Sequence, residues 1–157
     1  MVGSEAPKRG EQSRTQEKSG KDFLTVGIGA SAGGVQALRE FFAKMPPDSG
    51  MAFAVVLHLS QTYVSNLAEI LGRETKMPVV QVTEAVKVEP NHVYVIPPAK
   101  GLEMIDGIVR VTQPQRSRGA RVVIDRFFRT LADAYGASAV GIILSGTGED
   151  VSLGLKK

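Results

Sequence analysis

Short apolar runs alternate with amphipathic segments along most of this chain, and this alternation constrains the fold more than any other feature. We expect buried strands at residues 23–29, 51–57, 78–82, 93–96 and 139–144, and helices at 33–44, 64–75 and 124–135. Strands that are apolar on both faces and alternate with helices are typical of a parallel sheet covered on both sides. The sequence therefore predicts an α/β fold with a doubly wound, mostly parallel sheet and helices on both faces, a Rossmann-like three-layer sandwich.

A small β-hairpin is expected beside this sheet. The runs 102–105 and 108–111 flank Asp106-Gly107, a pair that is typical of a type I′ turn. A polar loop is expected to follow over 113–121.

Composition excludes several classes of protein. The chain has 157 residues, which suits one domain. It has no Cys and only two His, so we expect neither a disulfide scaffold nor a metal site built on Cys or several His. The longest apolar run, 51–57, is far shorter than the ~20 residues that cross a bilayer, so membrane insertion is not expected.

The N-terminal segment differs from the rest of the chain. Residues 1–21 carry five basic and three acidic side chains and very few apolar ones. This composition predicts a disordered polar tail over 1–22, before a folded domain over 23–157. The segment lacks the apolar core of a signal peptide, so we expect a cytoplasmic protein. The remainder is close to neutral, which argues against a nucleic-acid partner.

The first strand end carries a candidate nucleophile. Gly29-Ala30-Ser31-Ala32-Gly33 fits G-x-S-x-G between a strand and a helix, where two glycines would allow a strained turn that exposes the Ser31 hydroxyl. An incidental serine in a glycine-rich turn explains the motif equally well. A dinucleotide fingerprint is a third interpretation, but it requires an acid at the end of the second strand, and His58 stands there instead.

Two further strand ends carry partners for a serine. His58 ends the second strand and could accept the serine proton, whereas His92 precedes a strand and is expected at the opposite end of the sheet. After the strand 139–144, Glu149 and Asp150 are both candidates to orient an imidazole, and Ser145 is a competing hydroxyl. A serine, a histidine and a carboxylate at one edge of a sheet together predict a serine hydrolase.

These segments resemble one known family. The matching segments are Val26-Gly27-Ile28-Gly29-Ala30-Ser31-Ala32-Gly33-Gly34, Val56-Leu57-His58-Leu59-Ser60, Val93-Tyr94-Val95-Ile96-Pro97-Pro98, Ile124-Asp125-Arg126-Phe127-Phe128 and Leu144-Ser145-Gly146-Thr147-Gly148-Glu149-Asp150. From about Leu24 to Lys157, the chain resembles the catalytic domain of CheB-type chemotaxis methylesterases. It is most similar to the form fused to a CheR-type methyltransferase.

The resemblance implies an activity and its residues. Members of the family hydrolyse glutamate methyl esters on the cytoplasmic helices of chemoreceptors, and some also deamidate receptor glutamines. It implies that Ser31 is the nucleophile, His58 the general base and Asp150 its partner, in preference to Glu149. Backbone groups near Ala32 and Thr147 would hold the oxyanion. No cofactor or metal is implied, and a CheR-type methyltransferase is an expected partner.

Departures from the family pattern motivate an alternative. Val151 stands where relatives have glycine, and a β-branched residue would be strained if that turn needs a positive φ. The chain ends at Lys157, before C-terminal elements that relatives carry, and no receiver domain precedes residue 23. These features predict a truncated domain, with a non-catalytic remnant or binding module as the alternative to an active methylesterase.

Overall fold

A computed structural model of the chain describes residues 22–58, 66–113 and 120–144. Within these ranges five strands form one parallel sheet in the order β3-β5-β2-β1-β8. Their bounds are β1 Thr25–Ser31, β2 Ala52–His58, β3 Val79–Gln81, β5 Val93–Val95 and β8 Ala139–Leu144. β1 therefore lies between β2 and β8, and every pair of neighbours in this sheet is parallel.

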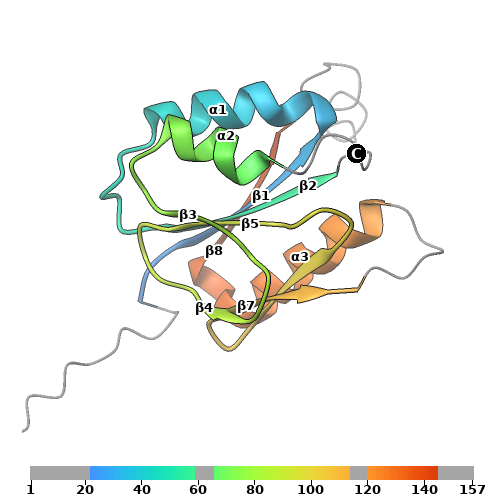
Figure 1. Cartoon of the computed structure of the whole chain (residues 1–157). Helices are drawn as coiled ribbons and strands as arrows, with labels where there is room; N and C mark the ends of the chain where they lie inside the picture. The colour runs from blue at the N-terminus through green and yellow to red at the C-terminus, as the bar shows by residue number, and fades with distance from the viewer. Residues whose placement is uncertain (1–21, 59–65, 114–119, 145–157) are drawn as a thin grey trace, which may run out of the picture.

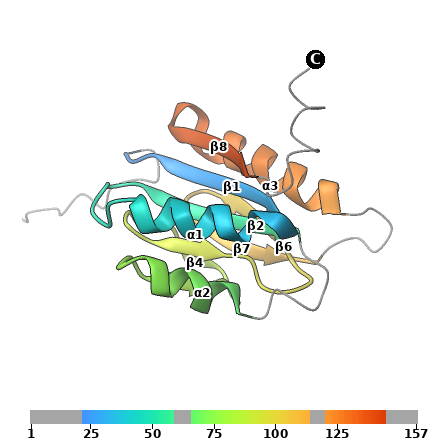
Figure 2. The same ribbon diagram turned by 90° about the horizontal axis from the view of Figure 1, so that it is seen from above.

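Helices cover both faces of the parallel sheet, as the sequence predicted. α1 (Val35–Lys44) and α2 (Leu67–Glu74) lie on one face, and α3 (Ala120–Tyr135) lies on the other (Figure 1). A short 3₁₀ turn, η1 (Ala32–Gly34), connects β1 to α1, and a second, η2 (Gly136–Ser138), connects α3 to β8. Seen from above, α1 runs over the strands while α3 lies behind them (Figure 2). The three-layer α/β prediction is confirmed.

A small antiparallel sheet shares the α3 side of the molecule. β6 (Gly101–Ile105) and β7 (Ile108–Thr112) form the predicted hairpin, and β4 (Val86–Lys87) adds a strand that the sequence did not reveal. The turn residues Asp106 and Gly107 have φ values of 49° and 78°. Two successive positive φ angles are what a type I′ turn requires, so this prediction is confirmed.

The core explains why these segments fold as they do. The side chains of β2 are almost fully buried from Ala52 to Leu57, as the continuous apolar run predicted. On the α1 side, the rings of Phe41, Phe42 and Phe53 pack edge to face, with centroids 5.1–6.0 Å apart. On the other side, Phe127 and Leu131 of α3 are no more than 1% exposed. α3 thus packs against the parallel sheet through a buried apolar stripe.

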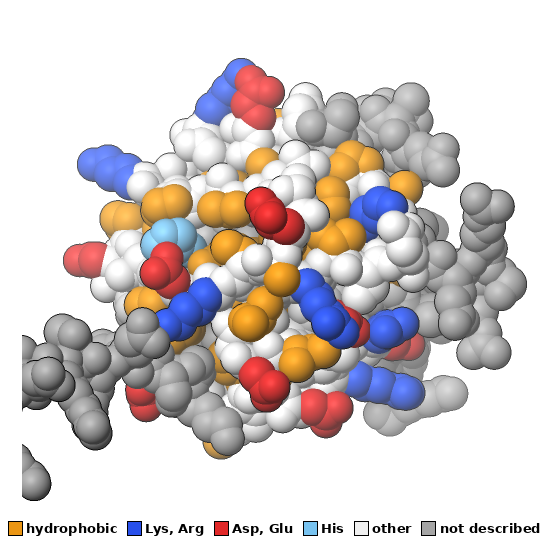
Figure 3. All heavy atoms as spheres, turned by 60° about the horizontal axis from the view of Figure 1, so that its bottom comes forward, with side chains coloured by type: hydrophobic (Ala, Val, Ile, Leu, Met, Phe, Trp, Pro, Cys, Tyr) orange, Lys and Arg blue, Asp and Glu red, His pale blue; other side chains and the backbone are white. Residues whose placement is uncertain are grey.

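Polar contacts fasten α3 to the hairpin. Glu103 is 5% exposed, and its carboxylate accepts hydrogen bonds from Arg110 of β7 and from Arg126 of α3, the latter at 3.2 Å. Burying a carboxylate is costly unless charged donors surround it, and here two guanidinium groups do so. Basic and acidic side chains are interspersed among apolar ones on this side of the molecule (Figure 3).

No helix in the described part of the chain is long and apolar enough to cross a membrane.

Candidate active site

Ser31 and His58 occupy paired positions at the ends of neighbouring strands. In the parallel ladder between β1 and β2, each is the final residue of its strand, and their Cα positions are partners in register. Neighbouring strands lie about 4.8 Å apart, so the two backbones are adjacent at one edge of the sheet. The predicted proximity of these two positions is confirmed.

The strand that carries Ser31 ends two residues later than the sequence suggested. β1 continues to Ser31 itself, which has extended backbone angles of φ −85° and ψ 172°, and η1 begins at the next residue. Ser31 is half-buried, and its hydroxyl makes no capping hydrogen bond to η1. Ser31 is therefore the final residue of β1 and does not cap η1 through its side chain.

The glycines around Ser31 serve packing instead of a strained turn. Gly29 lies inside β1 without a positive φ, so the expectation of a strained turn there is wrong. A Cβ on Gly29 would lie 3.1 Å from atoms of both Ile124 and Phe128 of α3. A Cβ on Gly27 would lie 2.6 Å from Leu131. These contacts explain both glycines through helix-on-sheet packing, with no need for a dinucleotide.

A third strand end lies beside Ser31. β8 pairs with β1 on the side opposite β2, and Ala30 is the register partner of Leu144, the last residue of β8. A Cβ on Gly34 would lie 3.1 Å from the carbonyl oxygen of Leu144, so the turn after Ser31 packs directly on the end of β8. The ends of β2, β1 and β8 are therefore neighbours, as predicted.

Several predicted site residues cannot be placed further. Asp150, Thr147, Glu149 and Ser145 follow β8 and lie outside the described residues, as does Val151. The backbone of Ala32 is described and begins η1 directly after Ser31. Where the structure does describe side chains, no three His, Asp or Glu residues gather in a group that could hold a metal ion.

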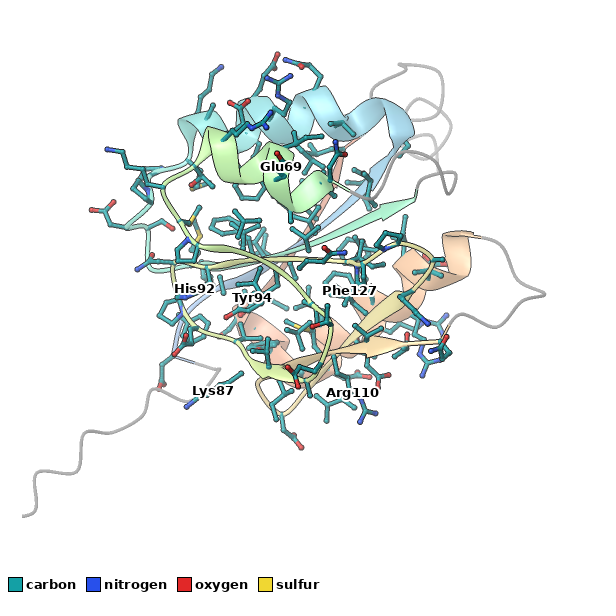
Figure 4. The ribbon with its side chains drawn as sticks, in the orientation of Figure 1. Glu69, Lys87, His92, Tyr94, Arg110 and Phe127 are labelled. Carbon is teal, nitrogen blue, oxygen red and sulfur yellow. The ribbon has the colours of Figure 1, made fainter. Side chains whose placement is uncertain are left out.

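His92 lies at the other end of the sheet. It directly precedes β5, where its ring stacks on Tyr94 with centroids 6.1 Å apart (Figure 4). Its Nδ1 lies 2.8 Å from the carbonyl oxygen of Pro90, and its Nε2 lies 3.6 Å from Glu89. The prediction that His92 is remote from the serine is confirmed, and its neighbours give it a structural role.

Two buried tyrosines, Tyr94 and Tyr135, lie away from the sheet edge that carries Ser31 and His58. Burial raises the pKa of Tyr94, whose hydroxyl accepts a hydrogen bond from the Glu89 N–H and donates one to the Lys87 carbonyl. Burial also raises the pKa of Tyr135, at the C-terminal end of α3. Neither group neighbours the strand ends that carry Ser31 and His58.

Sequence reasoning missed two features of the packing around α3. The first is the contact of Phe128 with Gly29. The sequence hinted at this contact only through alternate glycines in the strand and two adjacent phenylalanines in the helix. The second is the buried Glu103, whose signal was an acid within an apolar strand and opposite Arg110 in the hairpin register.

Comparisons with known proteins agree on one family. Residues 26–157 match the family model described as CheB methylesterase. A protein-glutamate methylesterase/protein-glutamine glutaminase of Syntrophus aciditrophicus is 30% identical over 139 residues, which cover 87% of this chain and 39% of that protein. One from Xanthomonas oryzae pv. oryzae is 37% identical over 134 residues, covering 83% and 37%. The chain thus spans about two fifths of the length of these relatives.

A solved structure supports the same fold. The Thermotoga maritima CheB methylesterase catalytic domain has a TM-score of 0.67 and 23% identity with this chain, covering 77% of this chain and 66% of its own. The family match begins at Val26, the second residue of β1, and continues to Lys157. On this match, the chain belongs to the CheB methylesterase family.

Proposed function

We propose that this chain hydrolyses glutamate methyl esters on chemoreceptors, in chemotaxis signalling. The observation that carries the proposal is the register pairing of Ser31 with His58 at the edge of the sheet where ligands bind in open α/β folds. The names of the relatives, protein-glutamate methylesterase/protein-glutamine glutaminase, support an acyl-transfer reaction on glutamate side chains. They also support deamidation of receptor glutamines as a second reaction.

In the proposed mechanism, Ser31 Oγ attacks the ester carbonyl while His58 accepts the hydroxyl proton. Asp150 orients the imidazole and stabilises its charged form. Backbone groups at Ala32 and near Thr147 stabilise the oxyanion. The C–O bond to the methoxy group then breaks, and methanol leaves with the proton from His58. Water, deprotonated by His58, cleaves the glutamyl-enzyme to release glutamate and restore Ser31.

The proposal assigns partners as well as a reaction. The substrate would be the methylated cytoplasmic helices of chemoreceptors, and a CheR-type methyltransferase would supply the methyl groups that this chain removes. Both assignments, and a cytoplasmic location, follow from the resemblance to CheB-type enzymes. No step of the mechanism requires a metal or a cofactor.

Methanol release from a methylated receptor fragment tests the proposal. We expect Ser31→Ala to lower the rate at least about a thousandfold, since a catalytic triad loses most of its effect when the nucleophile is removed. Ser49→Ala is the matched control, because Ser49 lies before β2 at the opposite end of the sheet, where its hydroxyl accepts the Met51 N–H. His58→Ala should abolish turnover and His92→Ala should not. Equal rates for Ser31→Ala and the unaltered chain would refute the proposal.

A further inference from the structure

The ring of Phe128 lies against glycines on two strands next to the candidate site. A Cβ on Gly29 of β1 would lie 3.1 Å from Phe128 Cε2, and one on Gly141 of β8 would lie 3.3 Å from Phe128 Cε1. The register places Gly141 beside Gly27 and Ile143 beside Gly29, so the ring spans the line where β1 meets β8. Phe128 is therefore in contact with both strands that end beside the turn after Ser31.

Ser31 shares its face of the sheet with these glycines. Alternate residues of a strand point to the same face, and Gly27, Gly29 and Ser31 are alternate residues of β1. The two glycines face α3, because their nearest neighbours are α3 side chains. Ser31 thus lies one step further along the row of positions that α3 covers.

α3 is held in place from its other side. The hydroxyl of Thr130 accepts a hydrogen bond of 3.0 Å from the Met104 N–H of β6. Arg126 pairs with the buried Glu103 of the same strand. These contacts flank Phe128 along the helix, so the ring cannot retreat from Gly29 without disturbing polar contacts to the hairpin.

We propose that Phe128 is a positioning residue for Ser31. Its ring, backed by β6, sets how far the end of β1 lies from α3 and thereby fixes the nucleophile relative to His58 on β2. The consequence for catalysis rests on the proposed function, whereas the consequence for the backbone of Ser31 does not. Small misplacements of a reacting group are costly, and a displacement of about 1 Å can reduce the rate about 100-fold.

Gly29→Ala is the direct perturbation. The new methyl group would meet Ile124, Phe128 and Ile143 at 3.1–3.2 Å, so strand or helix must shift by a few tenths of an ångström. We expect kcat for ester hydrolysis to fall about tenfold with KM changed less than about twofold, since a positioning defect acts on the transition state. The amide NMR shifts of Ser31 and Ala32 should move as well.

Two controls separate positioning from general destabilisation. Gly72→Ala adds a methyl group on α2 where nothing lies within 4 Å, and should leave both measurements unchanged. Leu71→Ala truncates a fully buried side chain on the opposite face, and should lower the melting temperature without changing kcat of the folded protein. A kcat loss in Leu71→Ala equal to that in Gly29→Ala would overturn the proposal.

Rescue by a smaller side chain decides the role of the ring. In the Phe128→Leu background, the fall in log kcat caused by Gly29→Ala should be less than half of the fall that it causes in the otherwise unaltered chain. The Ser31 amide shift should also move back toward its original value. An undiminished loss would overturn the proposal. If Gly29→Ala does not fold, Phe128→Leu alone should still move the Ser31 amide, and an unmoved amide would count equally against it. If the unaltered chain hydrolyses no ester, the proposed function fails, while the amide shifts still test the positioning.

Discussion

The two buried tyrosines of the described structure should respond in opposite ways to the same substitution. The hydroxyl of Tyr94 makes two hydrogen bonds, one of 2.9 Å from the Glu89 N–H and one of 3.1 Å to the Lys87 carbonyl. The hydroxyl of Tyr135 is buried close to that of Thr25, but neither makes a hydrogen bond of good geometry among the described residues. The two side chains are buried to nearly the same extent, 2% and 3% exposed, so each substitution to Phe changes mainly the polar contacts.

Simple hydrogen-bond energetics give the magnitudes. Each hydrogen bond contributes about 1 kcal/mol net, so Tyr94→Phe should lower the free energy of unfolding by about 2 kcal/mol. An unpartnered buried hydroxyl costs about 1 kcal/mol or more, so Tyr135→Phe should raise it by about 1 kcal/mol. At about 2–4 °C per kcal/mol for a chain of this size, the melting temperature should fall about 4–8 °C in the first variant. It should rise about 2–4 °C in the second.

Urea unfolding followed by circular dichroism, with the melting temperature from calorimetry, measures both variants. The pair serves as its own control, because the same oxygen atom is removed from two equally buried rings. A loss of stability in Tyr135→Phe as large as that in Tyr94→Phe would refute the reasoning, since it would mean that the Tyr135 hydroxyl has a strong partner.

Two further predictions concern charge. Burial raises the pKa of Tyr94 and Tyr135 above 10, so above pH 10 the unfolded chain releases protons that the folded chain retains. Stability should therefore be intact below pH 10 and fall above it, by at most about 1.4 kcal/mol per pH unit for each tyrosine, and urea unfolding at pH 9–11 should show a smaller decline in the double Phe variant. At Glu103, Arg110→Ala and Arg126→Ala should each cost about 1 kcal/mol because the other arginine remains, whereas the double variant should cost about 3–5 kcal/mol by leaving a buried carboxylate without a cation. If the loss of unfolding free energy in the double variant equals the sum of the two single losses, this account is contradicted. As a control, Arg73→Ala should lower the free energy of unfolding by less than about 0.5 kcal/mol, because its partner Glu69 is exposed.

The sequence was sufficient to predict the layers, the strand ends and the hairpin, because each has a local signal. Buried parallel strands are continuous apolar runs, and the Asp106-Gly107 turn depends on its own two residues. The two-residue strand β4 has no such signal, since Val86 and Lys87 form a strand only through pairing with β7. The strained turn at Gly29 was predicted wrongly for the same reason. The role of that glycine depends on α3, almost a hundred positions later in the chain, and no local pattern reveals which helix a strand will face.

The candidate site was predictable in part. The positions of Ser31 and His58 follow from the rule that parallel strands end at one edge, and the register confirms their pairing. The support behind Ser31 was not predictable, because the contact of Phe128 with Gly29 and the pairing of Arg126 with Glu103 arise only when three elements meet. The roles assigned to Asp150 and Thr147 remain predictions, as those residues lie outside the described ranges.

The sheet order has a consequence for how this protein folds. The strand that bears Ser31 is the first described strand, yet one of its two neighbours is the last described strand, with Thr25 paired to Ala139. Such distant pairing closes slowly, since chain entropy is lost before the contacts form. Until β8 docks, β1 is an open edge able to pair with other chains. The emerging polypeptide therefore acquires Ser31 well before the strand that completes the surroundings of this residue, which makes β8 docking the step at which misassembly competes with folding.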